Sequence, residues 1–178
     1  MEGADWLAIG LLAALLALAF VLLRLRSARR GEGDPAGRLP LAVIDGSNVM
    51  HWRDGTPALA TVRAVVETLR AQGYKPGVIF DANAGYKLMG RYQDDADLAR
   101  AIGMPARDVL VVPKGQQADP FLLDFARDTG AVLISNDRFR DRIEDYPALA
   151  TPGRIRRGGW RDGRIWLERP RSPEREQP

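Results

Sequence analysis

Aspartates follow short apolar runs at several points of this sequence, a spacing that brings carboxylates together if the runs are neighbouring strands. Asp45 directly follows residues 41–44, and Asp137 comes three residues after the run 131–134. Carboxylates gathered in one place raise one another's pKa, and a divalent cation removes that conflict. An oxygen-rich set of ligands suits Mg²⁺ or Mn²⁺, which activates water and stabilises charge on a phosphodiester.

Ordinary structural roles would also explain each of these polar residues singly. The alternatives are a turn for Asp45 and Asp81, a local backbone hydrogen bond for Asn48, a helix N-cap for Asp119 and Asp137, and a solvated helix surface for Asp141. For Asp81 we favour the turn. For the other residues, their joint placement at one edge of a predicted sheet favours a shared site.

Several other chemistries are excluded by composition. The chain has no cysteine and a single histidine, His51, so it cannot build a zinc cluster from these residues or use a cysteine nucleophile. A serine hydrolase would need His51 and a G-x-S-x-G turn, which the sequence lacks. The net charge of +3 is too small to indicate nucleic-acid binding, which requires a local basic surface.

The elements that must position these residues alternate along the chain. Short apolar runs predict buried strands at residues 41–44, 77–80, 109–112 and 131–134. Helical patterns occupy residues 59–69, 95–102 and 119–129, with glycines marking their ends. Strands that alternate with helices predict βαβ units and a parallel sheet, in which ligands bind at the carboxyl ends of the strands.

Two expectations concern the C-terminal third. A helical stretch that begins at Asn136-Asp137 would place Asp137 and Asp141, four residues apart, on one helix face. Residues 154–157 and 164–167 are predicted to be late strands, joined by a turn at Asp162-Gly163.

The N-terminal segment has a different character. Residues 6–23 carry no charge, and a helix of that length spans about 27 Å, close to a hydrocarbon core of about 30 Å. Arginines follow the apolar run, so we predict a single-pass membrane protein with the N-terminus outside and the domain in the cytoplasm. The predicted organisation is a short tail (1–5), a transmembrane helix (6–25), a basic Gly-Pro linker (26–40), the globular domain (41–168) and a disordered tail (169–178).

Three stretches together resemble a known family. The stretch Val43-Ile44-Asp45-Gly46-Ser47-Asn48-Val49 resembles the first-strand motif of NYN-type, PIN-like nucleases. Residues 118–121 (Ala-Asp-Pro-Phe) and 134–141 (Ile-Ser-Asn-Asp-Arg-Phe-Arg-Asp) resemble later motifs of regnase-type endoribonucleases. The resemblance covers about residues 41–167. It implies a three-layer α/β/α PIN-like domain with a mainly parallel central sheet, which would follow the transmembrane helix.

The resemblance also implies roles for particular residues. It makes Asp45, Asp119, Asp137 and Asp141 the acidic centre that binds Mg²⁺ or Mn²⁺, with Asn48 orienting a ligand or a water. The implied activity is metal-dependent endonucleolytic cleavage of single-stranded or stem-loop RNA. The basic residues expected to hold RNA phosphates are Lys114, Arg138, Arg140, Arg154, Arg156 and Arg157.

The sequence departs from the family pattern in ways that keep other functions open. Ala118 stands where regnases can carry an acid, and the cysteine-rich zinc finger that accompanies regnase domains is absent. A PIN-like module that binds RNA or a protein at the membrane without cleavage is therefore one alternative. A metal-dependent phosphatase is less favoured, because no second Asp lies two residues after Asp45. PIN-like domains often pair, which adds a homodimer to the expectations.

Overall fold

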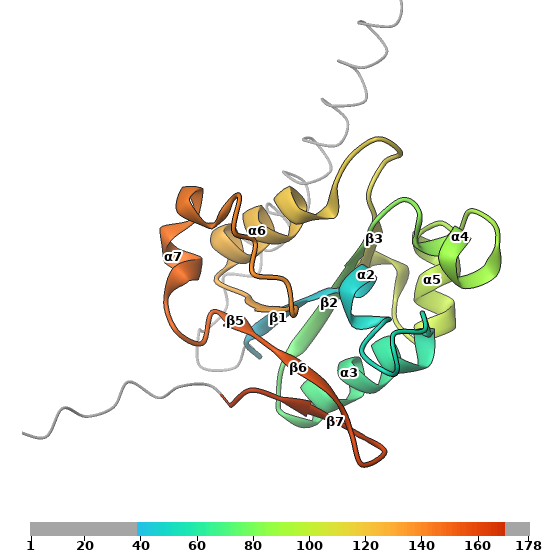
Figure 1. Cartoon of the computed structure of the whole chain (residues 1–178), viewed down its shortest axis with the longest axis horizontal. Coiled ribbons are helices and arrows are strands. Elements are labelled where there is room, and N and C mark those ends of the chain that lie inside the picture. The colour runs from blue at the N-terminus through green and yellow to red at the C-terminus, as the bar shows by residue number, and fades with distance from the viewer. Residues whose placement is uncertain (1–38, 170–178) are drawn as a thin grey trace, which may run out of the picture. The chain divides into compact units, whose positions relative to one another are not determined.

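A five-stranded parallel sheet forms the centre of the domain (Figure 1). The computed structural model describes residues 39–169. The strands lie in the order β3-β2-β1-β4-β5, so the chain builds outward from β1 in one direction and then in the other. The point where the direction reverses, between β1 and β4, is where open parallel sheets of this kind bind ligands.

The elements follow each other as alternating strands and helices. The strands of the main sheet are β1 (Leu41–Asp45), β2 (Lys75–Phe80), β3 (Val109–Val111), β4 (Val132–Ile134) and β5 (Ile155–Arg156). The helices are α2 (Gly46–Val49), α3 (Leu59–Ala71), α4 (Ala84–Met89), α5 (Asp95–Ile102), α6 (Ala118–Thr129) and α7 (Pro147–Ala150), and short 3-10 turns occupy Ala106–Asp108 and Ile143–Asp145. A separate antiparallel hairpin consists of β6 (Gly158–Arg161) and β7 (Arg164–Leu167).

Alternating side chains of β1 and β2 fill two hydrophobic cores, one on each face of the sheet. Ile44 and Phe80 pack into the first core, with residues of α3 and α5. Val43 and Ile79 point the other way and pack against α6 and α7. Because successive strand residues face opposite sides, both faces must be covered, which explains the continuous apolar runs. The predicted three-layer α/β/α arrangement is confirmed.

The junction between β1 and α2 is tightly packed against β2. A Cβ at Gly46 would lie 2.5 Å from Cε1 of Phe80, closer than any side chain tolerates. Phe80 is fully buried, so its ring cannot move aside. Gly46 thus lets the residue before it, Asp45, sit at the very end of the buried strand.

The predicted helix after Asn136 is wrong. Residues 135–142 form an irregular loop with turns, in which Phe139 has a φ of 47° and is buried. Burial of the Phe139 ring in the core against α6 and α7 sets the path of this loop, and a helix would not allow that backbone conformation. Asp137 and Asp141 therefore do not share a helix face.

The predicted pairing of the late strands is partly wrong. The turn at Asp162-Gly163 is correct, and both residues have positive φ, as type I′ hairpins require. Its first strand, however, is Gly158–Arg161, whereas Ile155–Arg156 joins the main sheet beside β4.

The predicted transmembrane helix, residues 6–25, lies outside the described residues, as does nearly all of the predicted disordered tail. Among residues 39–169, no helix has the length and apolar character needed to cross a bilayer. The membrane anchor and the localisation stay predictions.

Candidate active site

Asp45 ends β1 with a carboxylate that is almost entirely buried, at 6% exposure. Its Oδ1 accepts a hydrogen bond from the Asn48 backbone N–H at 3.0 Å, and its Oδ2 accepts one from the Ser135 hydroxyl at 2.8 Å. These two donors fix the orientation of the carboxylate. Each oxygen still has a second lone pair with which to bind a ligand.

Burial raises the pKa of Asp45 from its usual 3.8 to about 7. The hydrogen bonds from Ser135 and Asn48 act in the opposite direction, and the negative charges of Asp119 and Asp81 add to the rise. Asp45 is therefore a carboxyl group whose charged form lacks a compensating positive partner. An uncompensated buried carboxylate is costly and is typical of sites where a cation or a proton is part of the function.

Asn48 and Ser135 connect the ends of β1 and β4. The side-chain oxygen of Asn48 accepts from the Asn136 backbone N–H at 3.0 Å and from the Trp52 indole N–H at 2.8 Å. Ser135 donates to Asp45 and accepts from the Asp137 backbone N–H at 3.0 Å. Asn48 therefore holds the site together, and it also lines the pocket beside Asp137.

Asp119 lies in the first turn of α6, and its negative charge adds to the raised pKa of Asp45. Its own pKa is raised, first by burial and then by the charges of Asp137 and Asp81, while Arg142 opposes the rise. The N-cap role considered for Asp119 is wrong, because α6 begins at Ala118. The Ala118 N–H instead donates to Oδ1 of Asp81 at 3.1 Å.

The side chain of Ala118, the first residue of α6, is buried in the hydrophobic core at 2% exposure. An alanine supplies no oxygen ligand, so the departure from the family pattern leaves this position without the acid that regnases can carry.

Asp137 and Asp141 are both exposed and line a pocket of about 450 Å³. The pocket is lined by Asn48, Asn136, Asp137, Arg138, Arg140 and Asp141. Oδ1 of Asp137 accepts from the Phe139 N–H at 2.7 Å, so this carboxylate also shapes the loop. The negative charge of Asp137 raises the pKa of Asp119. The charge of Asp141 is not among the causes of the raised pKa of Asp45 or of Asp119. Asp141 thus stands at the margin of the site.

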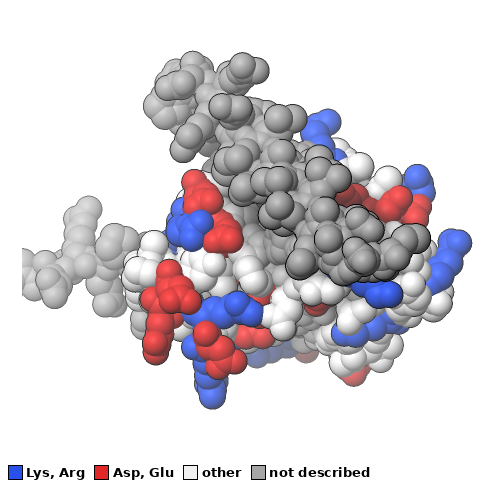
Figure 2. All heavy atoms as spheres, turned by 90° about the horizontal axis from the view of Figure 1, so that it is seen from above, with Lys and Arg blue, Asp and Glu red and all other residues white. Residues whose placement is uncertain are grey.

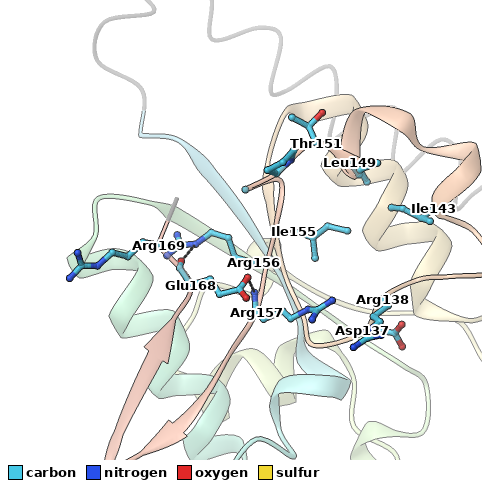
Figure 3. Close-up of a pocket in the computed structure, with 13 residues that line it drawn as sticks. Asp137, Arg138, Ile143, Leu149, Thr151, Ile155, Arg156, Arg157, Glu168 and Arg169 are labelled. Carbon is cyan, nitrogen blue, oxygen red and sulfur yellow. Dashed lines mark hydrogen bonds between the residues drawn. The ribbon is translucent and has the colours of Figure 1, made fainter. Parts of the chain in front are cut away.

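A second pocket of about 610 Å³ lies beside β5 and shares Asp137 and Arg138 with the first (Figure 3). In Figure 3 the side chain of Arg157 points toward Asp137 and Arg138. Arg138 and Arg157 are therefore placed to hold a phosphate beside the acidic residues, since arginine forks match phosphate oxygens.

The other two arginines of the predicted 154–157 cluster serve the fold. Arg156 is buried at 2% exposure and donates from Nε to the Glu168 backbone oxygen. Arg154 donates to the backbone oxygens of Gly130 and Ala126, at the C-terminal end of α6. These contacts give both guanidinium groups a role in the fold, and their assignment as RNA contacts stays a prediction. Lys114 is exposed after β3 and lines neither pocket.

Sequence reasoning missed three contributors to this site. Ser135 orients Asp45, Asp81 receives the first N–H of α6 and adds charge beside Asp45, and Asn136 binds Asn48. The sequence alone favours a turn role for Asp81. The signal that could have identified all three is their position directly after predicted strands, which the apolar runs do reveal.

Charged side chains of both signs lie on the face of the domain shown in Figure 2. Lys and Arg side chains are interspersed there with Asp and Glu side chains. Binding of a phosphate polymer on this face would thus depend on individual arginines and not on a broad basic surface.

The donor chemistry of the site fits a hard divalent cation, because all its candidate ligands are oxygen atoms. Within residues 39–169 no three His, Asp or Glu side chains are close enough to hold an ion by themselves. Mg²⁺ does not need such a group, since it usually keeps several waters and binds through one or two carboxylates and substrate phosphates. Asp45 and Asp119 are the pair that fits best, because both are partly or fully buried with raised pKa values and the charge of Asp119 adds to the rise at Asp45.

Removal of the Ser135 hydroxyl should destabilise the domain. In Ser135→Ala the buried Asp45 carboxylate loses a donor, which raises its pKa further and costs about 1–3 kcal/mol at pH 7.5. Urea unfolding measures the loss. Ser47→Ala is the matched control, because Ser47 at the same edge accepts only a backbone N–H, from Asp81 at 2.8 Å. An equal loss in both variants would contradict a special role for Ser135.

A comparison with family models gives one match. The model described as the Zc3h12a-like ribonuclease NYN domain matches residues 38–157. These residues include all of the side chains around Asp45 described above. No curated protein matches the sequence significantly.

Solved structures share the fold. The crystal structure of nuclear proteinaceous RNase P 2 (PRORP2) from A. thaliana has a TM-score of 0.59 and 18% identity, over 95% of this chain and 37% of that chain. A structure of Arabidopsis thaliana nuclear protein-only RNase P 2 has a TM-score of 0.57 and 22% identity, over 90% and 36%. The chain thus spans little more than a third of these proteins, and the likeness establishes the fold.

Proposed function

This chain belongs to the Zc3h12a-like ribonuclease NYN domain family, and from that membership we propose that it is a divalent-metal-dependent endoribonuclease with Asp45 at its active site. The observation that carries the proposal is the buried Asp45 carboxylate, which hydrogen bonds from Ser135 and Asn48 orient and on which the charge of Asp119 acts. A nuclease needs a concentration of negative charge that recruits a cation to a phosphodiester, and this arrangement provides it.

We assign cation binding and RNA binding to different residues of the site. Asp45 and Asp119 would hold Mg²⁺ or Mn²⁺, with Asp137 acting through its charge on Asp119. When bound, such an ion lowers the pKa of a water and offsets negative charge on the phosphate. Arg138 and Arg157 would hold the RNA backbone in the adjoining pocket, with the scissile phosphate toward Asp137.

The structural relatives support the substrate class. They are protein-only RNases P, and they share this fold with the chain. Because the chain covers only about a third of their length, nothing about their particular substrate is transferred. We propose single-stranded or looped RNA as the substrate, because the pockets beside Asp137 are open and sequence-specific RNA sites mostly bind unpaired bases.

The test is cleavage of a labelled stem-loop RNA by the full-length chain in mild detergent. We expect internal cuts in the loop with Mg²⁺ or Mn²⁺, and none with EDTA. Asp137→Asn should lower the rate, whereas the matched control Asp128→Asn, an exposed aspartate near the other end of α6, should not. Cuts that persist in EDTA would refute the metal requirement. Intact RNA that nevertheless binds would favour a non-catalytic module.

A further inference from the structure

The β6–β7 hairpin lies beyond residue 157, where the family match ends, and the proposed chemistry does not use it. Its two faces differ. Ile165 and Leu167 pack against the core next to α3. Side chains alternate along a strand, so Gly159, Arg161, Arg164 and Trp166 share the other face. The hairpin therefore carries an outward face made of two arginines, a tryptophan and a glycine.

The indole of Trp166 lies flat across Gly159. These residues are directly opposite each other in the hairpin, and a Cβ on Gly159 would lie 2.9 Å from Nε1 of the indole. Any larger residue at Gly159 would lift the ring from the strand. Trp166 is 39% exposed, and the Arg161 guanidinium lies 5.4 Å from the centre of its ring. The hairpin thus presents an aromatic ring that Gly159 supports, with the Arg161 cation over the ring.

The base of the hairpin is fastened to the candidate active site. Asn136 makes two hydrogen bonds with Gly158, donating to its oxygen at 3.0 Å and accepting from its N–H at 3.1 Å. The backbone N–H of Asn136 donates to Asn48, and Asp137 is the next residue. Trp166 pairs with the residue after Gly158, one strand step of about 3.4 Å from this attachment. The aromatic surface is therefore held at a fixed distance from Asp137.

We propose that the outward face of the β6–β7 hairpin, formed by Arg161, Arg164 and Trp166, binds unpaired bases of the RNA strand beside the active site. Every base has a π-face, so stacking on an aromatic ring holds single strands with little sequence preference. Arg161 and Arg164 contribute positive charge against the backbone phosphates. A rigid ring, already placed by Gly159, loses little conformational freedom when a base stacks on it.

This inference rests on the proposed function for the identity of the ligand as RNA. A peptide ligand is the main competing occupant. The two arginines on the face and its attachment beside Asp137 favour the polyanion, because a nuclease must hold the strand that enters its site.

The test is fluorescence anisotropy of a labelled single-stranded RNA with the full-length chain, in EDTA so that no cleavage occurs. We expect Trp166→Ala to raise Kd about tenfold. Trp166→Phe, which keeps a ring, should retain most of the affinity. Arg161→Ala should raise Kd several-fold and weaken its dependence on salt. The control is Arg100→Ala, an exposed arginine on α5 paired with Asp97, which should stay within twofold of the unmodified chain.

The outcomes separate this inference from the proposed function. Trp166→Ala, Trp166→Phe and Arg161→Ala all binding single strands within twofold of the unmodified chain would overturn the hairpin's role, even if that chain cleaves RNA. An equal loss of affinity for single-stranded and fully duplex RNA would also overturn it, because stacking needs unpaired bases. Because Trp166→Ala removes packing, the thermal stability of each variant is measured as well. If the hairpin of Trp166→Ala opens, Arg161→Ala still tests the proposal. The hairpin variants could lose single-strand binding selectively while the unmodified chain cleaves no RNA in the separate Mg²⁺ or Mn²⁺ assay. That result would support the hairpin's role and refute the nuclease.

Discussion

Asp45→Asn should lower RNA cleavage by at least about 100-fold while leaving the domain folded. A bound cation contributes several kcal/mol of charge stabilisation in phosphoryl chemistry, and about 1.4 kcal/mol corresponds to tenfold in rate. Asp45 is the most buried of the candidate ligands, and its carboxylate accepts hydrogen bonds from Ser135 and Asn48. No neighbouring carboxylate can therefore take its place. The amide oxygen of asparagine still accepts a hydrogen bond, so the fold does not depend on the charge.

The rates are measured with the same loop RNA at saturating Mn²⁺, and the fold is checked by circular dichroism. Asp119→Asn should show a loss of similar size, since the charge of Asp119 acts directly on Asp45 and the two would share the cation. Asp141→Asn should show a smaller loss, because Asp141 only lines the outer pocket. Full activity of Asp45→Asn would refute the assignment of the site. A loss of the same size in Asp128→Asn would show that the assay reports general damage and not chemistry.

The metal-free domain should become less stable as the pH rises from 5 to 7. The pKa of Asp45 is about 7 in the folded state, against 3.8 for an unburied aspartate. The folded state therefore binds this proton more tightly than the unfolded chain does. The stabilisation is fully present below pH 3.8, declines through the interval between the two pKa values, and is lost as the pH passes about 7.

The expected loss between pH 5 and pH 7 is about 2 kcal/mol, since each pH unit contributes at most about 1.4 kcal/mol in this interval. Urea unfolding in EDTA at several pH values measures it. Asp45→Asn carries no charge at this position, so its stability should vary less and should exceed that of the unmodified chain at pH 8. Parallel pH profiles for the two proteins would contradict the raised pKa.

Addition of Mn²⁺ extends this prediction. A ligand that binds only the folded state stabilises it, and a cation next to Asp45 favours the charged carboxylate. The unmodified chain should therefore gain stability from Mn²⁺ most strongly at pH 8, and Asp45→Asn should gain little. An equal gain in both proteins would place the ion elsewhere.

Much of the architecture could be predicted from local patterns. The apolar runs at 41–44, 77–80, 109–112 and 131–134 correspond to β1, β2, β3 and β4, because a strand buried on both faces must be continuously apolar. The end of α5 at Ile102 and that of α6 at Thr129 were marked by glycines that adopt positive φ in the structure. The rule that parallel sheets bind ligands at their carboxyl ends then indicated which aspartates to consider.

The family resemblance was also visible in the sequence, and the family match confirms it over residues 38–157. The assignments of Asp45, Asp119, Asp137, Asp141 and Asn48 as catalytic residues stay predictions. The structure brings Asp45 and Asp119 within electrostatic reach of each other and leaves Asp141 at the margin.

Tertiary packing alone decided the features that depend on distant partners. Ser135 orients Asp45 across 90 positions of sequence because β4 lies beside β1, and that strand order is not written in any local pattern. Burial of Phe139 accompanies a loop where a helix was expected, and Arg156 is buried although its residue type alone suggested an exposed position. The sequence by itself determined which segments are buried strands and helices, because periodicity and turn residues act over a few positions. Only the tertiary structure decides which polar side chains meet and how their pKa values shift. The reason is that the folded sheet brings the ends of distant strands together at one edge, where burial raises the pKa of Asp45.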